Sequence, residues 1–268
     1  MFTWGSGKSP ELVYTRGEGM GMNTSANSRT ANQGDGNSPV PVAVTTSVEL
    51  VIFDMAGTTV VDDGLVTQAF DAAATAIGVP AEGEERERAR QYVLDTMGQS
   101  KIAVFRALFG ADGAAETANA EFERAYGDLI AGGVEPVAGA AETFSDLRTR
   151  GIATAFTTGF SPATQQRILR SLGWTDAVDH VLAPTAGLRG RPFPDLVLAA
   201  ALTAQVDDLA NVIVVGDTSS DIETARRARA GLSVGVLTGA HDEATLRAAG
   251  ADHVLSSVAD LSTLLFTT

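Results

Sequence analysis

The chain has 268 residues and no cysteine, so it is long enough to fold as one or two domains without disulfide staples, and a thiolate zinc site and a cysteine nucleophile are excluded. Its 19 basic and 33 acidic residues give a formal net charge of −14, which argues against nucleic acid or an anionic membrane surface as a partner. No apolar run reaches the roughly 20 residues of a membrane-spanning helix, so we expect a cytoplasmic protein.

Residues 1–47 are rich in Gly, Ser, Asn and Thr and show no apolar periodicity. Such a segment cannot bury enough surface to offset the entropy of ordering it. We therefore expect a disordered N-terminal tail.

The remaining chain alternates between two kinds of pattern. Amphipathic stretches that end in glycine predict helices over 140–150 and 161–172. Short apolar runs rich in β-branched residues predict buried strands. These runs are 48–53, 152–156, 212–215, 232–237 and, more weakly, 253–255. The alternation predicts an α/β fold with a doubly wound parallel sheet of the Rossmann-like kind.

One stretch, 65–133, interrupts this alternation with helical patterns and no convincing strand. Its first apolar residues recur at helical spacing, and its charged run 82–90 predicts a solvated helix face. We expect an inserted all-helical cap domain over 65–133, with the α/β core formed by 48–64 and 134–268. Clefts between domains are common ligand sites.

Polar residues follow the predicted strands, and the carboxyl ends of parallel strands meet at one edge of a sheet. They include one arginine, three carboxylates and several small or hydroxyl-bearing residues that offer N–H and O–H donors. Hard oxygen ligands suit Mg²⁺, and the cation offsets the charge of a phosphoryl group. The set therefore predicts a magnesium-dependent phosphoryl site at this edge. Its members are Asp54, Gly57, Thr58, Thr157, Thr158, Arg191, Asp217 and Asp221.

In this order the motifs resemble those of the haloacid dehalogenase superfamily over residues 48–240. The resemblance implies that Asp54 is the nucleophile, which takes the phosphoryl group as an aspartyl phosphate. It also implies that Asp54, the Ala56 carbonyl and Asp217 bind Mg²⁺, that Asp221 supports the metal site, and that the helical stretch is the cap. The phosphoryl oxygens would be held by Gly57, Thr58, Thr157, Thr158 and Arg191.

Ala56 departs from the phosphatases of this superfamily, which generally have there a second aspartate that protonates the leaving oxygen. The chain is more similar to the phosphonatase branch, close to phosphonoacetaldehyde hydrolases, which share the Ala-Gly-Thr-Thr turn. That branch also places Met-Gly and then lysine in the cap, as in Met97, Gly98 and Lys101. The resemblance implies that Met97 and Gly98 contact the substrate.

Lys101 has a chemical reason to be a lysine. Breaking a P–C bond expels a carbanion unless a neighbouring aldehyde is first converted to an imine, which lysine can form and arginine cannot. The chain has 17 arginines but only two lysines, Lys8 and Lys101, and Lys101 alone lies in the predicted folded region. A histidine and a tyrosine of that branch are replaced by Val104 and Phe160.

These observations favour hydrolysis of the P–C bond of phosphonoacetaldehyde or a close analogue, with Mg²⁺ as cofactor. Two alternatives stay open: a phosphomonoesterase of a small metabolite, of the phosphoglycolate or sugar phosphate type, and a non-catalytic protein that binds a phosphate ligand. The expected partner is a small phosphorylated or phosphonate metabolite. A homodimer is also left open.

Overall fold

The computed structural model describes residues 47–110 and 113–266. The predicted disordered tail, apart from Ser47, lies outside these ranges and stays a prediction. Within them, no helix combines the length and the apolar character that crossing a bilayer requires.

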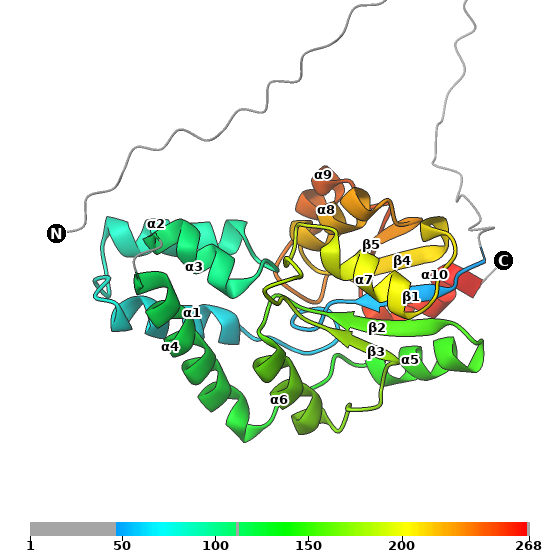
Figure 1. Ribbon diagram of the computed structural model, residues 1–268, viewed down its shortest axis with the longest axis horizontal. Coiled ribbons are helices and arrows are strands. Elements are labelled where there is room, and N and C mark those ends of the chain that lie inside the picture. Colours follow the sequence, from blue (N-terminus) through cyan, green and yellow to red (C-terminus); the bar gives the residue numbers. More distant parts are fainter. Residues whose placement is uncertain (1–46, 111–112, 267–268) are drawn as a thin grey trace, which may run out of the picture. The chain divides into compact units, whose positions relative to one another are not determined.

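Six strands of the described chain form a parallel sheet in the order β3-β2-β1-β4-β5-β6 (Figure 1). The chain runs outward from β1 to β3 and then returns to β4 beside β1, so the carboxyl ends of β1 and β4 border the crevice where such sheets bind ligands. The predicted doubly wound α/β fold is confirmed. The strands are β1 (Leu50–Phe53), β2 (Ala153–Thr157), β3 (His180–Leu182), β4 (Val212–Gly216), β5 (Leu232–Val236) and β6 (His253–Leu255).

The helices occur in two groups. Between β1 and β2 lie α1 (Leu65–Ala76), α2 (Glu84–Asp95), α3 (Lys101–Phe109), α4 (Ala114–Leu129), the 3-10 helix η1 (Ile130–Gly132) and α5 (Ala140–Thr149). The later helices are α6 (Pro162–Leu172), α7 (Asp195–Thr203), η2 (Leu209–Asn211), α8 (Ser219–Ala228), α9 (Glu243–Ala249), η3 (Val258–Asp260) and α10 (Leu261–Phe266). The helices predicted over 140–150 and 161–172 correspond to α5 and α6.

Alternate residues of β1 face opposite layers of helices. Leu50 and Ile52 pack in an apolar cluster with residues of α7 and α8. Phe53 points the other way and meets Phe144 of α5 at 5.1 Å between ring centroids. Because both faces of β1 are buried, its sequence is a continuous apolar run and ends where Asp54 reaches the edge of the sheet.

Helices α1 to α4 and η1 form a helical insert, residues 65–132, in which the described chain contains no strand, as predicted. Its centre is aromatic: Phe70 of α1 stacks on Phe105 of α3 at 5.8 Å, and Phe105 meets Phe122 of α4 edge-on at 5.8 Å. The apolar cluster of the insert continues into one face of the sheet. The division into a core and a cap domain therefore stays a prediction.

The charged run of α2 is not a uniformly solvated face, which corrects the expectation from the sequence. Arg86 is only 1% exposed. Its guanidinium donates to the carboxylate and carbonyl of Asp71, the hydroxyl of Thr75 and the carbonyls of Val79 and Pro80. A buried cation with all donors satisfied ties α2 to α1.

Candidate active site

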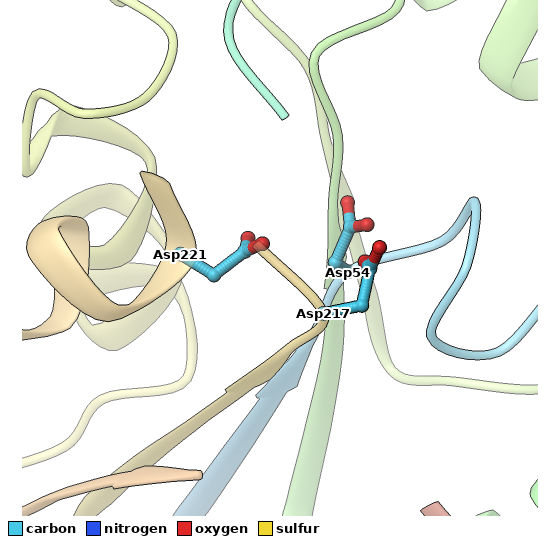
Figure 2. A group of neighbouring side chains, drawn as sticks. All are labelled: Asp54, Asp217 and Asp221. Carbon is cyan, nitrogen blue, oxygen red and sulfur yellow. The ribbon is translucent and has the colours of Figure 1, made fainter. Parts of the chain in front are cut away.

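Three buried carboxylates meet at the carboxyl end of the sheet (Figure 2). Asp54 follows β1 directly, Asp217 follows β4, and Asp221 lies in the first turn of α8. One carboxylate oxygen from each residue lies within 4.8 Å of the other two. The parallel sheet therefore brings Asp54 together with Asp217 and Asp221, which lie far later in the chain and only four residues from each other.

Arg191 joins two of these carboxylates. Its Nη2 donates to Asp54 Oδ1 at 2.5 Å, and its Nη1 donates to Asp221. The guanidinium is buried, and its Nε–H has no hydrogen-bond partner among the described residues. An unsatisfied buried donor beside an acidic cluster calls for an explanation, and an anionic ligand provides one.

The acidic cluster has the chemistry of a divalent metal site. Burial raises the pKa of Asp54 well above its usual range, opposed by Arg191 and assisted by repulsion from Asp221 and Asp217. Burial and repulsion from Asp221 raise the pKa of Asp217 to about 6. A cation on these oxygens would stabilise their ionised forms, so the donor set fits Mg²⁺.

Asp217 is held from two sides. Its Oδ1 accepts a hydrogen bond from the Thr58 hydroxyl at 2.9 Å, and its Oδ2 accepts one from the Ala240 amide at 2.8 Å. A side chain on Gly57 or Gly239 would collide with this carboxylate, so both positions require glycine. The sequence motifs identified Gly57, but they did not identify Gly239 and Ala240, which follow β5.

A cavity of about 330 Å³ is lined by residues from the strand ends and from the helical insert. The predicted site residues that line it are Asp54, Ala56, Gly57, Met97, Gly98, Lys101, Thr158, Arg191 and Asp217. Thr58, Thr157 and Asp221 do not line it. Thr58 and Asp221 instead contact two residues that do, Asp217 and Arg191.

Lys101, the first residue of α3, reaches this cavity from the insert. Its amide donates to the carbonyl of Gly159 at 3.1 Å, which fixes the start of α3 against the end of β2. The Nζ lies 5.4 Å from the ring centroid of Phe160 and 5.9 Å from that of Phe122. Burial, with repulsion from Arg191, lowers the pKa of Lys101 from 10.5 to about 8.

The loop before α3 fits closely against the sheet. Gly98 has φ +80°, and a side chain there would collide with the hydroxyl of Thr218. A side chain on Gly159 would in turn collide with the carbonyls of Gly98 and Gln99. This close approach places Met97, Gly98 and Lys101 in the wall of the cavity.

Other lining residues carry polar groups that no motif identified. Asp62 precedes α1, and its Oδ1 accepts a hydrogen bond from the Val66 amide at 3.3 Å. Burial raises the pKa of Asp62. Thr218 caps α8 through Asp221. An acidic residue followed by an apolar helical stripe was the only available signal for Asp62, and it is equally typical of a helix start.

Residues 48–229 match the family model of the haloacid dehalogenase-like hydrolases. This match, together with the fold and the acidic cluster, shows that the chain belongs to the haloacid dehalogenase-like hydrolase family. The chain is thus a hydrolase.

Curated relatives resolve this membership further. The phosphonoacetaldehyde hydrolase of Bordetella avium is 32% identical over 205 residues, which are 69% of this chain and 70% of that protein. That of Bacillus cytotoxicus is 29% identical over 217 residues, 73% of this chain and 78% of that protein. The resemblance to the phosphonatase branch is confirmed.

Solved structures agree with this placement. A phosphonoacetaldehyde hydrolase-like protein from Oleispira antarctica has a TM-score of 0.71 at 25% identity and covers 85% of this chain and 94% of its own. A hydrolase from Pseudomonas syringae has the same TM-score and sequence identity, and it covers 80% of this chain and 96% of its own.

Proposed function

We propose that the protein hydrolyses the P–C bond of phosphonoacetaldehyde or a close analogue, with Asp54 as nucleophile and Lys101 as the amine that forms an imine. One observation carries this proposal. Lys101 lies in the same cavity as the acidic cluster and Arg191, and its pKa is lowered to about 8. A buried amine with that pKa is partly neutral near physiological pH and so can attack an aldehyde.

The phosphonate group would lie at the sheet edge. Arg191 supplies the fixed positive charge, and the hydroxyl of Thr158, which also lines the cavity, can donate to a phosphonate oxygen. Gly57 lines the cavity as well, but its amide donates to the carbonyl of Val60 at 2.7 Å. Mg²⁺, held by Asp54, the carbonyl of Ala56 and Asp217, with Asp221 as support, would supply positive charge that offsets the phosphonate.

The reaction then attaches the substrate covalently to two residues, as an imine on Lys101 and as an aspartyl phosphate on Asp54. Lys101 and the aldehyde form a protonated imine with release of water. The Asp54 carboxylate attacks phosphorus, the P–C bond breaks, and its electron pair moves into the imine to give an enamine. Protonation and hydrolysis of the enamine free the aldehyde product and Lys101, and water hydrolyses the aspartyl phosphate.

A phosphomonoesterase is the second candidate, favoured by the surroundings of the amine. Lys101 lies near the rings of Phe122 and Phe160, and cation–π contacts stabilise a protonated amine. In that reaction Lys101 stays charged and only binds the substrate.

Borohydride reduction distinguishes the two. In the presence of phosphonoacetaldehyde it should trap an adduct on Lys101, located by mass spectrometry, and inactivate the enzyme. Lys101→Arg keeps the charge and should lose the adduct and P–C cleavage while still binding inorganic phosphate. The matched control is Lys8→Arg, which removes the other lysine of the chain and should react as the parent does.

An absent adduct combined with full P–C cleavage by Lys101→Arg would exclude the imine. Hydrolysis of phosphomonoesters alone would then support the second candidate. Binding of phosphate with no turnover of any substrate would support a non-catalytic role.

A further inference from the structure

Imine formation moves protons that the residues named so far do not handle. The Lys101 ammonium must lose one proton before it attacks, and the hydroxyl formed on the aldehyde carbon must gain one to leave as water. The rings of Phe122 and Phe160 near the amine offer no such group. Asp54 is the nucleophile of the proposed function, and Asp217 is held by Thr58 and Ala240.

Asp62 is a further carboxylate in the wall of this cavity. It belongs to the segment between β1 and α1, whereas Lys101 begins α3, so the insert brings the two into the same cavity from different segments. The Val66 amide holds Oδ1 of Asp62 at 3.3 Å, which limits the rotation of the carboxylate. The side chain is half-buried rather than solvated at the surface.

We propose that Asp62 is the general base and general acid of the imine step, an inference that rests on the proposed function. Through an intervening water, the Asp62 carboxylate removes a proton from the Lys101 ammonium, and the neutral amine attacks the aldehyde. A proton then passes from the Lys101 nitrogen, now bonded to the aldehyde carbon, to the oxygen on that carbon. The Asp62 carboxylic acid gives its proton to this hydroxyl, the C–O bond breaks, and water leaves the protonated imine. Asp62 ends as a carboxylate.

The charges around the two groups agree with this exchange. Burial raises the pKa of Asp62, opposed by the Val66 amide and then by Lys101. Burial and Arg191 lower the pKa of Lys101, opposed first by Asp62 and then by Asp54 and Asp217. Neighbouring Asp63 raises the pKa of Asp62 further. Acid and amine thus approach each other in pKa, which reduces the free energy of moving a proton between them.

The test measures the rate at which borohydride traps the Lys101 adduct with phosphonoacetaldehyde. Asp62→Asn keeps an oxygen for the Val66 amide but cannot carry the proton, and trapping should slow about 100-fold. Asp128→Asn is the matched control, because it removes the same charge from an exposed side chain of α4 that does not line the cavity, and trapping should stay within about twofold of the parent. Asp62→Glu restores a carboxylate and should recover part of the rate.

A second substrate separates proton transfer from a structural role. Hydrolysis of 4-nitrophenyl phosphate needs no imine, and its leaving group needs no proton, so Asp62→Asn should retain this activity and the parent's melting temperature. Equal loss of both activities in Asp62→Asn would overturn the inference in favour of a structural role.

The proposed function and the role of Asp62 are overturned by different results. No adduct in the parent would overturn the proposed function and this inference together. An adduct that forms in Asp62→Asn as fast as in the parent would overturn only the role of Asp62.

Discussion

Ala56 lines the cavity two residues after Asp54, the proposed nucleophile, at the position where phosphatases of the superfamily generally have an acid. Ala56→Asp should therefore raise the hydrolysis of alkyl phosphomonoesters, by about 100-fold if proton donation to the leaving oxygen is what limits it. P–C cleavage should not improve, because its leaving group is the enamine. Steady-state kcat/KM on both substrate classes measures this.

Aryl phosphates are the control for Ala56→Asp, because their leaving groups need little protonation. Their hydrolysis should change far less than that of alkyl esters. An equal fall for both classes would mean that the larger side chain disturbs the Asp54 site instead of supplying a proton.

The lowered pKa of Lys101 predicts the pH dependence of adduct formation. The neutral amine is the reactive form, and a lower pKa moves its appearance to lower pH. The trapping rate should rise with pH up to about 8 and then level off. For a lysine with the ordinary pKa of about 10.4, the trapping rate would continue to rise until the pH reaches about 10.4. A profile that still rises steeply above pH 9 would contradict the buried position of the amine.

At the scale of elements, the loop before α3 controls how closely the insert approaches α8. In Gly98→Ala the new methyl group would collide with Thr218, whose hydroxyl donates to Asp221 Oδ2 at 2.5 Å. Asp221 in turn accepts from Arg191. We expect kcat/KM to fall by about 10- to 100-fold, because small displacements of catalytic groups are costly.

Gly78→Ala is the matched control for Gly98→Ala. Gly78 also has positive φ, at +90°, but a side chain there meets open space. Both variants should lose about 1–2 kcal/mol of stability to backbone strain in thermal or denaturant unfolding. Only Gly98→Ala should lose activity. Similar kinetics for the two would show that the contact with Thr218 has no catalytic importance.

The secondary structure was predictable where a segment buries a long apolar run. Strand β1 is covered on both faces, and its limits in the sequence are clear. Strand β3 was missed, although its sequence His-Val-Leu is the same as that of β6, which was predicted only weakly, and both are edge strands of three half-buried residues. An edge strand of that length owes its conformation to its neighbour rather than to its own sequence.

The candidate site was predictable where a residue lies in a motif at a strand end, as for Asp54 and Asp217. Asp62 and Ala240 were not predictable in this way, because their contribution depends on which distant segment folds against them. Ala240 acts only through its backbone amide. A backbone donor leaves no trace in residue type, so only the fold reveals it.

At the scale of the whole molecule, a polar contact joins the insert to the α/β part. Glu123 of α4 accepts hydrogen bonds from Ser161 at 2.6 Å and from Thr164, at the start of α6. Glu123→Ala should lower the free energy of unfolding by about 1–3 kcal/mol, because it leaves partly buried donors without a charged acceptor. Chemical denaturation measures this loss.

Glu121→Ala is the control for that prediction. Glu121 belongs to the same helix, but its partner Arg124 is 60% exposed, and surface pairs of this kind contribute about 0–1 kcal/mol. Equal losses in the two variants would mean that Glu123 stabilises α4 alone and not its contact with α6.

The contacts that assemble the acidic cluster join very distant parts of the chain. Arg191 and Asp54 are 137 residues apart, and Thr58 and Asp217 are 159 apart. The helical insert, by contrast, is built from neighbouring segments. Long-range contacts form late, since closing large loops costs entropy before any contact compensates for it. During refolding from denaturant, the helical circular dichroism signal should therefore recover before catalytic turnover, and turnover would report that the chain has completed its fold.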